Sequence, residues 1–216
     1  GAAGVLVFFI VAFFITAGLL LWYSGSAKLT GLALICAFVP VVWLLGLLPL
    51  IGFGIDPLSI LVPFLIFSIG VSHAVQMTNA WKLEVLGGSD ALAAARSSFS
   101  KLFVPGAMAL LANAVGFMVM VYIAIAVVRE LAITASLGVA VMVITNKMLL
   151  TILLSYLDLK PAEVEKLRVT GGEARGEWLW SRIKVFAQPR AALVVLVVTA
   201  VMLAGAAVKS RDMKTG

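Results

Sequence analysis

The chain has 216 residues, of which 63% are hydrophobic and 12% charged, and its formal net charge is +6. A water-soluble domain is about half apolar and about a quarter charged, so this composition excludes an ordinary soluble fold. The excess of basic residues does not indicate nucleic acid as a partner, because these residues lie between apolar runs, where orientation in a membrane explains them.

The apolar residues form six runs of roughly 18 to 27 residues, each long enough to cross a hydrocarbon core of about 30 Å as a helix. Backbone groups that face lipid must find hydrogen bonds within their own segment, so each run predicts a transmembrane helix. We therefore expect an all-α membrane protein, a multi-pass transmembrane helix bundle. In chain order the predicted spans cover residues 5–22, 32–51, 58–77, 102–128, 131–157 and 191–208.

Two of the connections carry local signals. Residues 52–57 predict a tight turn in which Asp56 caps the third span and Pro57 takes its first helical position. Residues 91–100 predict a short separate helix that follows two glycines and is capped by Ser89.

The longest polar stretch, residues 158–190, contains Trp178, Leu179, Ile183 and Phe186 among basic residues. This spacing is typical of an amphipathic helix that lies on an anionic membrane surface, and membrane lipids would then be its partner. A solvated linker with incidental aromatic side chains is the alternative.

The basic residues are distributed unevenly between the two sides of the predicted bundle. One side carries eleven and the other carries Arg129, Lys209, Arg211 and Lys214. The positive-inside rule assigns the richer side to the cytoplasm, so the start of the first span and the end of the chain face outward. The eleven are Lys28, Lys82, Arg96, Lys101, Lys160, Lys166, Arg168, Arg175, Arg182, Lys184 and Arg190.

Residues that bind metals or carry out covalent chemistry are scarce. Cys36 is the one cysteine and His73 the one histidine, so there is no disulfide framework and no ligand cluster for a metal. No nucleophile is paired with a base. We therefore expect no metal, no cofactor and no enzymatic activity.

The third predicted span carries the richest set of polar residues. Ser68, Ser72 and Gln76 recur at i, i+4 and i+8 and form one stripe, which His73 borders. Polar groups inside a membrane are costly unless partnered or wetted, so this stripe should face protein or a file of water. A histidine ordinarily titrates near neutral pH, which suits a proton relay. A neutral histidine that hydrogen-bonds between helices is an equally open interpretation.

Lys147 lies within the fifth span, about ten residues from its end and too deep to reach the interface easily. Hydroxyl groups of Thr151 and Ser155 follow at i+4 and i+8, but no anion lies within the predicted membrane core. We expect Lys147 to be neutral, wetted or paired with a carboxylate from outside this sequence; an incidental, tolerated lysine is the alternative. Asn113 in the fourth span is a candidate to hydrogen-bond the stripe, or to join helices.

Three segments carry a resemblance to a known family. They are Asp56-Pro57-Leu58-Ser59-Ile60, Gly70-Val71-Ser72-His73-Ala74 and Val128-Arg129-Glu130-Leu131. In sequence and spacing they resemble the resistance-nodulation-division (RND) superfamily, especially its MMPL-like exporters of lipids and other hydrophobic molecules. The resemblance covers nearly the whole chain.

The resemblance implies a place for this chain in a larger transporter. The six spans would be the second to seventh of twelve. Residues 1–157 would form the five-helix bundle of the first half, residues 158–190 the cytoplasmic linker, and residues 191–216 the first helix of the second half. The second half and the periplasmic domains of the same protein would then be partners outside this sequence, with a homo-oligomer or a periplasmic adaptor as further expected partners.

The family couples efflux to proton entry, as a proton antiporter, through acidic residues on the helix that corresponds to the third span. Here Ser72 and His73 stand at those positions. The resemblance thus implies a multi-pass transporter of the bacterial inner membrane that exports a hydrophobic small molecule or lipid. Its hypothetical proton relay comprises His73, Ser72, Gln76, Asn113 and Lys147. The alternative is a non-transporting sensor or regulatory module like the sterol-sensing domains.

Overall fold

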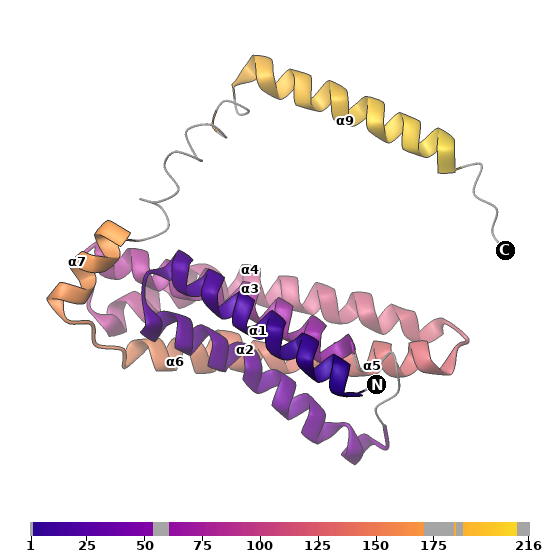
Figure 1. Cartoon of the computed structure of the whole chain (residues 1–216), viewed down its shortest axis with the longest axis horizontal. Coiled ribbons are helices and arrows are strands. Elements are labelled where there is room, and N and C mark those ends of the chain that lie inside the picture. The colour runs from indigo at the N-terminus through magenta and orange to yellow at the C-terminus, as the bar shows by residue number, and fades with distance from the viewer. Residues whose placement is uncertain (1, 54–60, 171–183, 185–187, 211–216) are drawn as a thin grey trace. The chain divides into compact units, whose positions relative to one another are not determined.

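The computed structural model describes residues 2–53, 61–170, 184 and 188–210 of the chain (Figure 1). Within these ranges the regular elements are helices, and six of the helical stretches are long and apolar enough to cross a membrane. The chain is an all-α, multi-pass membrane protein, as its apolar runs predict. It divides into two units, residues 1–171 and 172–216.

The first unit contains the helices that build the bundle. A π-helical segment, η3, joins α5 to α6 within one span, and short 3-10 turns, η1 and η2, follow α2 and α4. The elements are α1 (Ala2–Ser24), α2 (Ala27–Leu47), η1 (Pro49–Ile51), α3 (Leu61–Leu86), α4 (Ala91–Val119), η2 (Met120–Tyr122), α5 (Ala126–Met142), η3 (Val143–Leu149), α6 (Leu150–Ser155) and α7 (Pro161–Thr170).

One helix differs from its prediction. Residues 91–119 form a single helix, α4, so the expected separate helix over residues 91–100 is wrong. Its cap is Asp90, whose Oδ1 accepts a hydrogen bond from the backbone N–H of Ala93 at 2.7 Å, rather than Ser89. Residues 96–104 contain neither glycine nor proline, so nothing ends the helix there.

The ends of two helices also differ from the predicted span boundaries. Helix α3 runs past Met77 to Leu86 and stops at two glycines, of which Gly88 has a φ of +98° that suits glycine best. The fourth span ends earlier than predicted, because η2 and the extended residue Ile123 turn the chain before α5 begins at Ala126. This turn is made of apolar residues, so hydropathy did not reveal it.

Helix α2 packs against α1, α3, α5, α6 and η3 and holds the bundle together. Two apolar clusters fill the interior. The first contains Leu34, Ala37, Val41, Leu44, Leu48, Val62, Ile66, Phe67, Leu110, Ala135, Val139 and Met142. The second contains Leu29, Ala33, Cys36, Ala74, Met77, Trp81, Ala94, Ala95, Leu150, Leu154 and Leu167.

Ion pairs stabilise the end of the bundle that holds the second cluster. We call it the basic end, because Lys28 and Lys101 lie there. Lys28 at the start of α2 forms an ion pair with Glu163 of α7 at 2.8 Å. Leu167 of α7 is buried in the second cluster, and Lys101 of α4 pairs with Glu84 of α3. Helix α7 is therefore part of the bundle, although it lies in the stretch that the sequence assigns to the linker.

The second unit contains α9 (Pro189–Ser210), a single apolar helix that includes the sixth predicted span. The predicted amphipathic helix around Trp178 and Phe186 lies outside the described residues. So does the predicted cap formed by Asp56 and Pro57.

Candidate functional site: a buried polar centre

The π-helical segment η3 lies in the middle of the span Ala126–Ser155. Its backbone is wound more widely than an α-helix, and the N–H of Leu150 accordingly bonds the carbonyl of Thr145, five residues earlier. π segments are rare and occur frequently at functional sites. Three consecutive polar residues on this one, Thr145, Asn146 and Lys147, are each 0% exposed.

Lys147 projects toward α4, where it meets Gly106. A methyl group placed on Gly106 would overlap with Nζ and Cε of Lys147, so the missing side chain at Gly106 makes the space that the amine occupies. The amine has no hydrogen-bond partner among the described residues. Lys147 is buried in protein rather than extended toward the membrane surface.

The hydroxyl groups that follow Lys147 serve the helix backbone. Thr151 Oγ1 donates to the carbonyl of Lys147 at 2.6 Å, and Ser155 Oγ donates to the carbonyl of Ile152 at 2.7 Å. Neither hydroxyl bonds the amine. The ion pairs of the described helices lie elsewhere, at the basic end.

His73 on α3 belongs to the same interior region. It is 7% exposed, its Nδ1 has no partner among the described residues, and its helix α3 packs against η3. The side-chain oxygen and nitrogen of Asn146 are also buried and unpaired. We call His73, Asn146 and Lys147 the polar centre.

The polar centre lies between the two apolar clusters. Along the fifth span, Met142 belongs to the first cluster and Leu150 to the second, and η3 separates them. Along α3, Phe67 belongs to the first and Ala74 to the second, with His73 at the border. Lipid tails cannot hydrogen-bond these groups, so they can act only on each other, on water or on a proton.

The structure divides the residues of the predicted proton relay, together with Ser68 of the polar stripe, into two groups. His73 and Lys147 are buried, whereas Ser68, Ser72 and Gln76 lie on an exposed face of α3. Asn113 is likewise exposed on α4. The stripe on α3 thus points away from the interior of this bundle. Sequence reasoning missed Gly106 and the π segment, and Asn146-Lys147 within an apolar run was the only sign of either.

No family model, curated protein or solved structure matches this chain.

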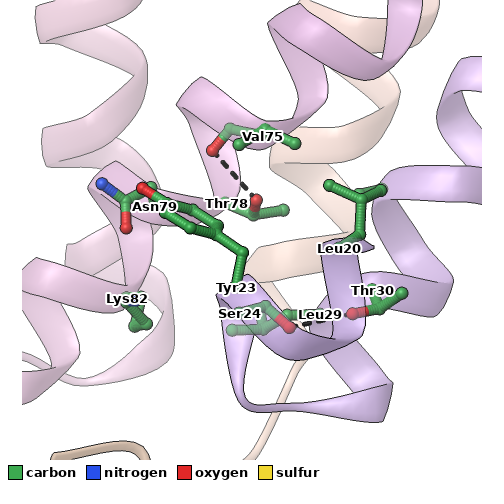
Figure 2. Close-up of a pocket in the computed structure, with 10 residues that line it drawn as sticks. Leu20, Tyr23, Ser24, Leu29, Thr30, Val75, Thr78, Asn79 and Lys82 are labelled. Carbon is green, nitrogen blue, oxygen red and sulfur yellow. Dashed lines mark hydrogen bonds between the residues drawn. The ribbon is translucent and has the colours of Figure 1, made fainter. Parts of the chain in front are cut away.

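A small cavity of about 10 Å³ lies near the basic end between α1, α2 and α3 (Figure 2). Ser24 and Thr30 share a hydrogen bond of 2.8 Å at its rim, and Lys82 Nζ lies 5.6 Å from the ring centre of Tyr23. Buried Asn79 Oδ1 has no partner among the described residues. The cavity has room for about one water molecule.

A much larger apolar groove of about 530 Å³ runs between α1 and α2. Its walls carry four phenylalanines and a tryptophan: Phe9, Phe13, Phe14, Phe38 and Trp43. A groove of this size and lining suits a hydrocarbon chain, because pockets that enclose drug-sized ligands measure about 300–1,000 Å³ and are mostly apolar.

Proposed function

We propose that this chain is the membrane part of a proton-driven, RND-type exporter of hydrophobic or amphiphilic molecules in a bacterial inner membrane. His73 and Lys147 are its proton-carrying groups. One observation carries the proposal: His73 and Lys147 are both buried, on the packed elements α3 and η3, and Nδ1 of the imidazole and Nζ of the amine lack partners among the described residues. Such groups are costly in a membrane, and ionisable residues inside membrane proteins typically mark the paths of protons or ions.

The exposed polar face of α3 supports the expected second half of the transporter. Ser68, Ser72 and Gln76 would contact lipid unless another part of the protein covers them, and polar groups in lipid are unfavourable. On α4, exposed Asn113 lies near small residues that permit close helix approach, Ala112 and Gly116. In the proposal these faces contact helices of the second half.

The apolar groove supports the substrate class. It is lined by α1 and α2 alone, and its aromatic walls offer no charged group to a bound molecule. A lipid or a hydrophobic drug would therefore enter it from the bilayer without losing hydrogen bonds to water.

Transport by the full-length protein in proteoliposomes tests the proposal, with a fluorescent phospholipid and a lipophilic dye as probes and an imposed proton gradient as the driving force. His73→Gln and Lys147→Met should each reduce gradient-driven export about tenfold or more, because general acid–base groups commonly contribute 10²-fold or more. Thr145→Val is the matched control: it lies in the same π segment, and its hydroxyl donates only to the backbone carbonyl of Met142. Unchanged export and an unchanged pH profile in both test variants would rule out the relay.

The open groove also favours a second candidate, a non-transporting sensor of membrane lipids similar to a sterol-sensing domain. The absence of the family's carboxylate at Ser72 and His73 points the same way. A protonophore separates the two functions. Export must stop when the proton gradient is dissipated, whereas binding of a fluorescent sterol or phospholipid by a sensor would persist.

A further inference from the structure

The contact between Lys147 and Gly106 has a consequence for the charge state of the amine. We propose that Lys147 and η3 form a protonation-sensitive switch, in which the uncharged amine is held over the Cα of Gly106 and leaves this position when it takes up a proton, as η3 converts to α-helix. This switch rests on the proposed function, because it describes how the same site is regulated.

The position over Gly106 suits an uncharged amine and not an ammonium group. Lys147 is 0% exposed, and its nitrogen faces the Cα of a glycine, which offers no acceptor. An ammonium group has three N–H donors and a full charge, and an unpaired buried charge is strongly unfavourable. Proton uptake therefore destabilises this arrangement relative to any in which the nitrogen reaches water or an acceptor.

The elements around η3 supply no compensating anion among the described residues. From α3 the buried titratable groups are His73 and Lys82, and neither is an anion. From α2 the buried titratable group is Cys36. The carboxylates of Glu84 and Glu130 lie near helix ends, the former paired with Lys101. The remaining charged groups of α4 and α5 are Arg96 and Arg129, both exposed.

The π segment provides a movement that frees the amine. Conversion of a π turn to α-helix shifts the register by one residue, which rotates the helix beyond it by about 100° and moves it by about 1.5 Å. Helix α6 follows η3 directly and is only six residues long. Its Ile152 is 54% exposed, whereas Leu150 and Leu154 are buried, so a rotation of α6 changes which side chains face the lipid.

The test reads this rotation in purified full-length protein reconstituted in lipid. A spin label on Ile152→Cys, in a background that carries Cys36→Ala, reports contact with lipid through its accessibility to dissolved oxygen. We expect accessibility to fall about twofold or more from alkaline to acidic pH, because a rotation of about 100° takes residue 152 off the outer face. A label on Ala140→Cys, exposed on α5 before the π segment, should not change.

Three variants test whether Lys147 and its contact with Gly106 cause the pH response of the label. Lys147→Met should abolish the pH response. Gly106→Ala should give the acidic signal at every pH, because the added methyl group overlaps with the amine. Gly116→Ala on the same helix meets nothing within 4 Å and should respond like the parent protein. If Gly106→Ala does not fold, the double variant with Lys147→Ala removes the collision and should fold without a pH response.

Two results would overturn the switch: a pH response that persists in Lys147→Met, or a Gly106→Ala protein that responds like the parent. The measurement is independent of transport. If the label responds as expected while Lys147→Met still exports normally, the switch stands and the relay role of Lys147 fails. If export is lost in Lys147→Met while the label never responds, the proposed function stands and the switch fails.

Discussion

Gly138 on α5 lies against two side chains of the first apolar cluster, Ile66 and Leu44. A methyl group at Gly138 would lie 2.6 Å from Cδ1 and 2.8 Å from Cγ1 of Ile66, and 3.2 Å from Cδ2 of Leu44. Ile66 and Leu44 are fully buried, so a shift of either side chain displaces other side chains of the core. Overpacking of this kind costs about 1–3 kcal/mol, against a gain of about 1 kcal/mol in helix propensity. Gly138→Ala should therefore lower the free energy of unfolding by up to about 2 kcal/mol.

Ile66→Ala supplies the second arm of a double-mutant cycle. In soluble proteins such a truncation costs about 2–5 kcal/mol, and transfer of the lost carbons from water contributes about 0.8 kcal/mol for each. Lipid is as apolar as the side chain, so the transfer contribution largely vanishes and about 1–3 kcal/mol of lost packing should remain. The methyl group of Gly138→Ala fills part of that cavity, and the double variant should recover about 1 kcal/mol or more relative to additivity.

Reversible unfolding by sodium dodecyl sulfate in mixed micelles, followed by tryptophan fluorescence, measures all four proteins of the cycle. Gly116→Ala is the control, because its methyl group meets open space and should leave stability unchanged or slightly raised. Strict additivity in the double variant, or a Gly138→Ala protein as stable as Gly116→Ala, would refute the packing of α5 against α3 described above.

Two further predictions concern polar contacts. A hydrogen bond from Lys28 and one from the backbone N–H of Lys160 hold the pKa of Glu163 below its usual value. The small contribution of this exposed contact to holding α7 should therefore be full above that usual value and be lost as pH falls through the lowered one. Hydrogen exchange of α7 amides, corrected for intrinsic rates, should become faster at acidic pH in the parent, whereas Glu163→Gln should exchange faster than the parent at neutral pH and lack this change; identical profiles would contradict it. Ser136→Ala should lower stability by about 0.6 kcal/mol, because Ser136 Oγ donates to the carbonyl of Ala114 on α4 at 2.9 Å. A loss no greater than that of Thr134→Val, whose hydroxyl bonds its own helix, would show that the contact contributes nothing.

The spans could be predicted because their physical cause is local. Run length and apolar composition require only the width of a bilayer, and all six predicted spans overlap a described helix. The errors occur where a change in composition and a helix boundary do not coincide. Tyr122 and Ile123 turn the chain without glycine, proline or charge, and α4 passes through Ser97, Ser98 and Ser100 without a break.

The candidate site was predictable only in part. The chemistry of His73 and Lys147 is visible in the sequence, because a titratable residue in an apolar run stands out. Their burial and the exposure of Ser72 and Gln76 are not, because helical periodicity places residues on a face without showing which neighbour that face meets. The role of Gly106 depends on a contact across 41 positions of sequence, and the polar pair Asn146-Lys147 marks the π segment without showing its winding.

The span that carries Lys147 has a further consequence for how the protein enters a membrane. A lysine at the centre of an inserting helix opposes insertion by about 2.5–3.5 kcal/mol, whereas each Leu, Ile, Val or Phe favours it by about 0.3–0.6 kcal/mol. The span Ala126–Ser155 has 30 residues, which is more than a bilayer requires, and most are aliphatic. Its surplus apolar length offsets the lysine, so the nascent helix can partition into lipid before α3 and α4 close around it. The helix that carries this titratable amine can thus insert on its own, and the amine is enclosed in the bundle interior afterwards.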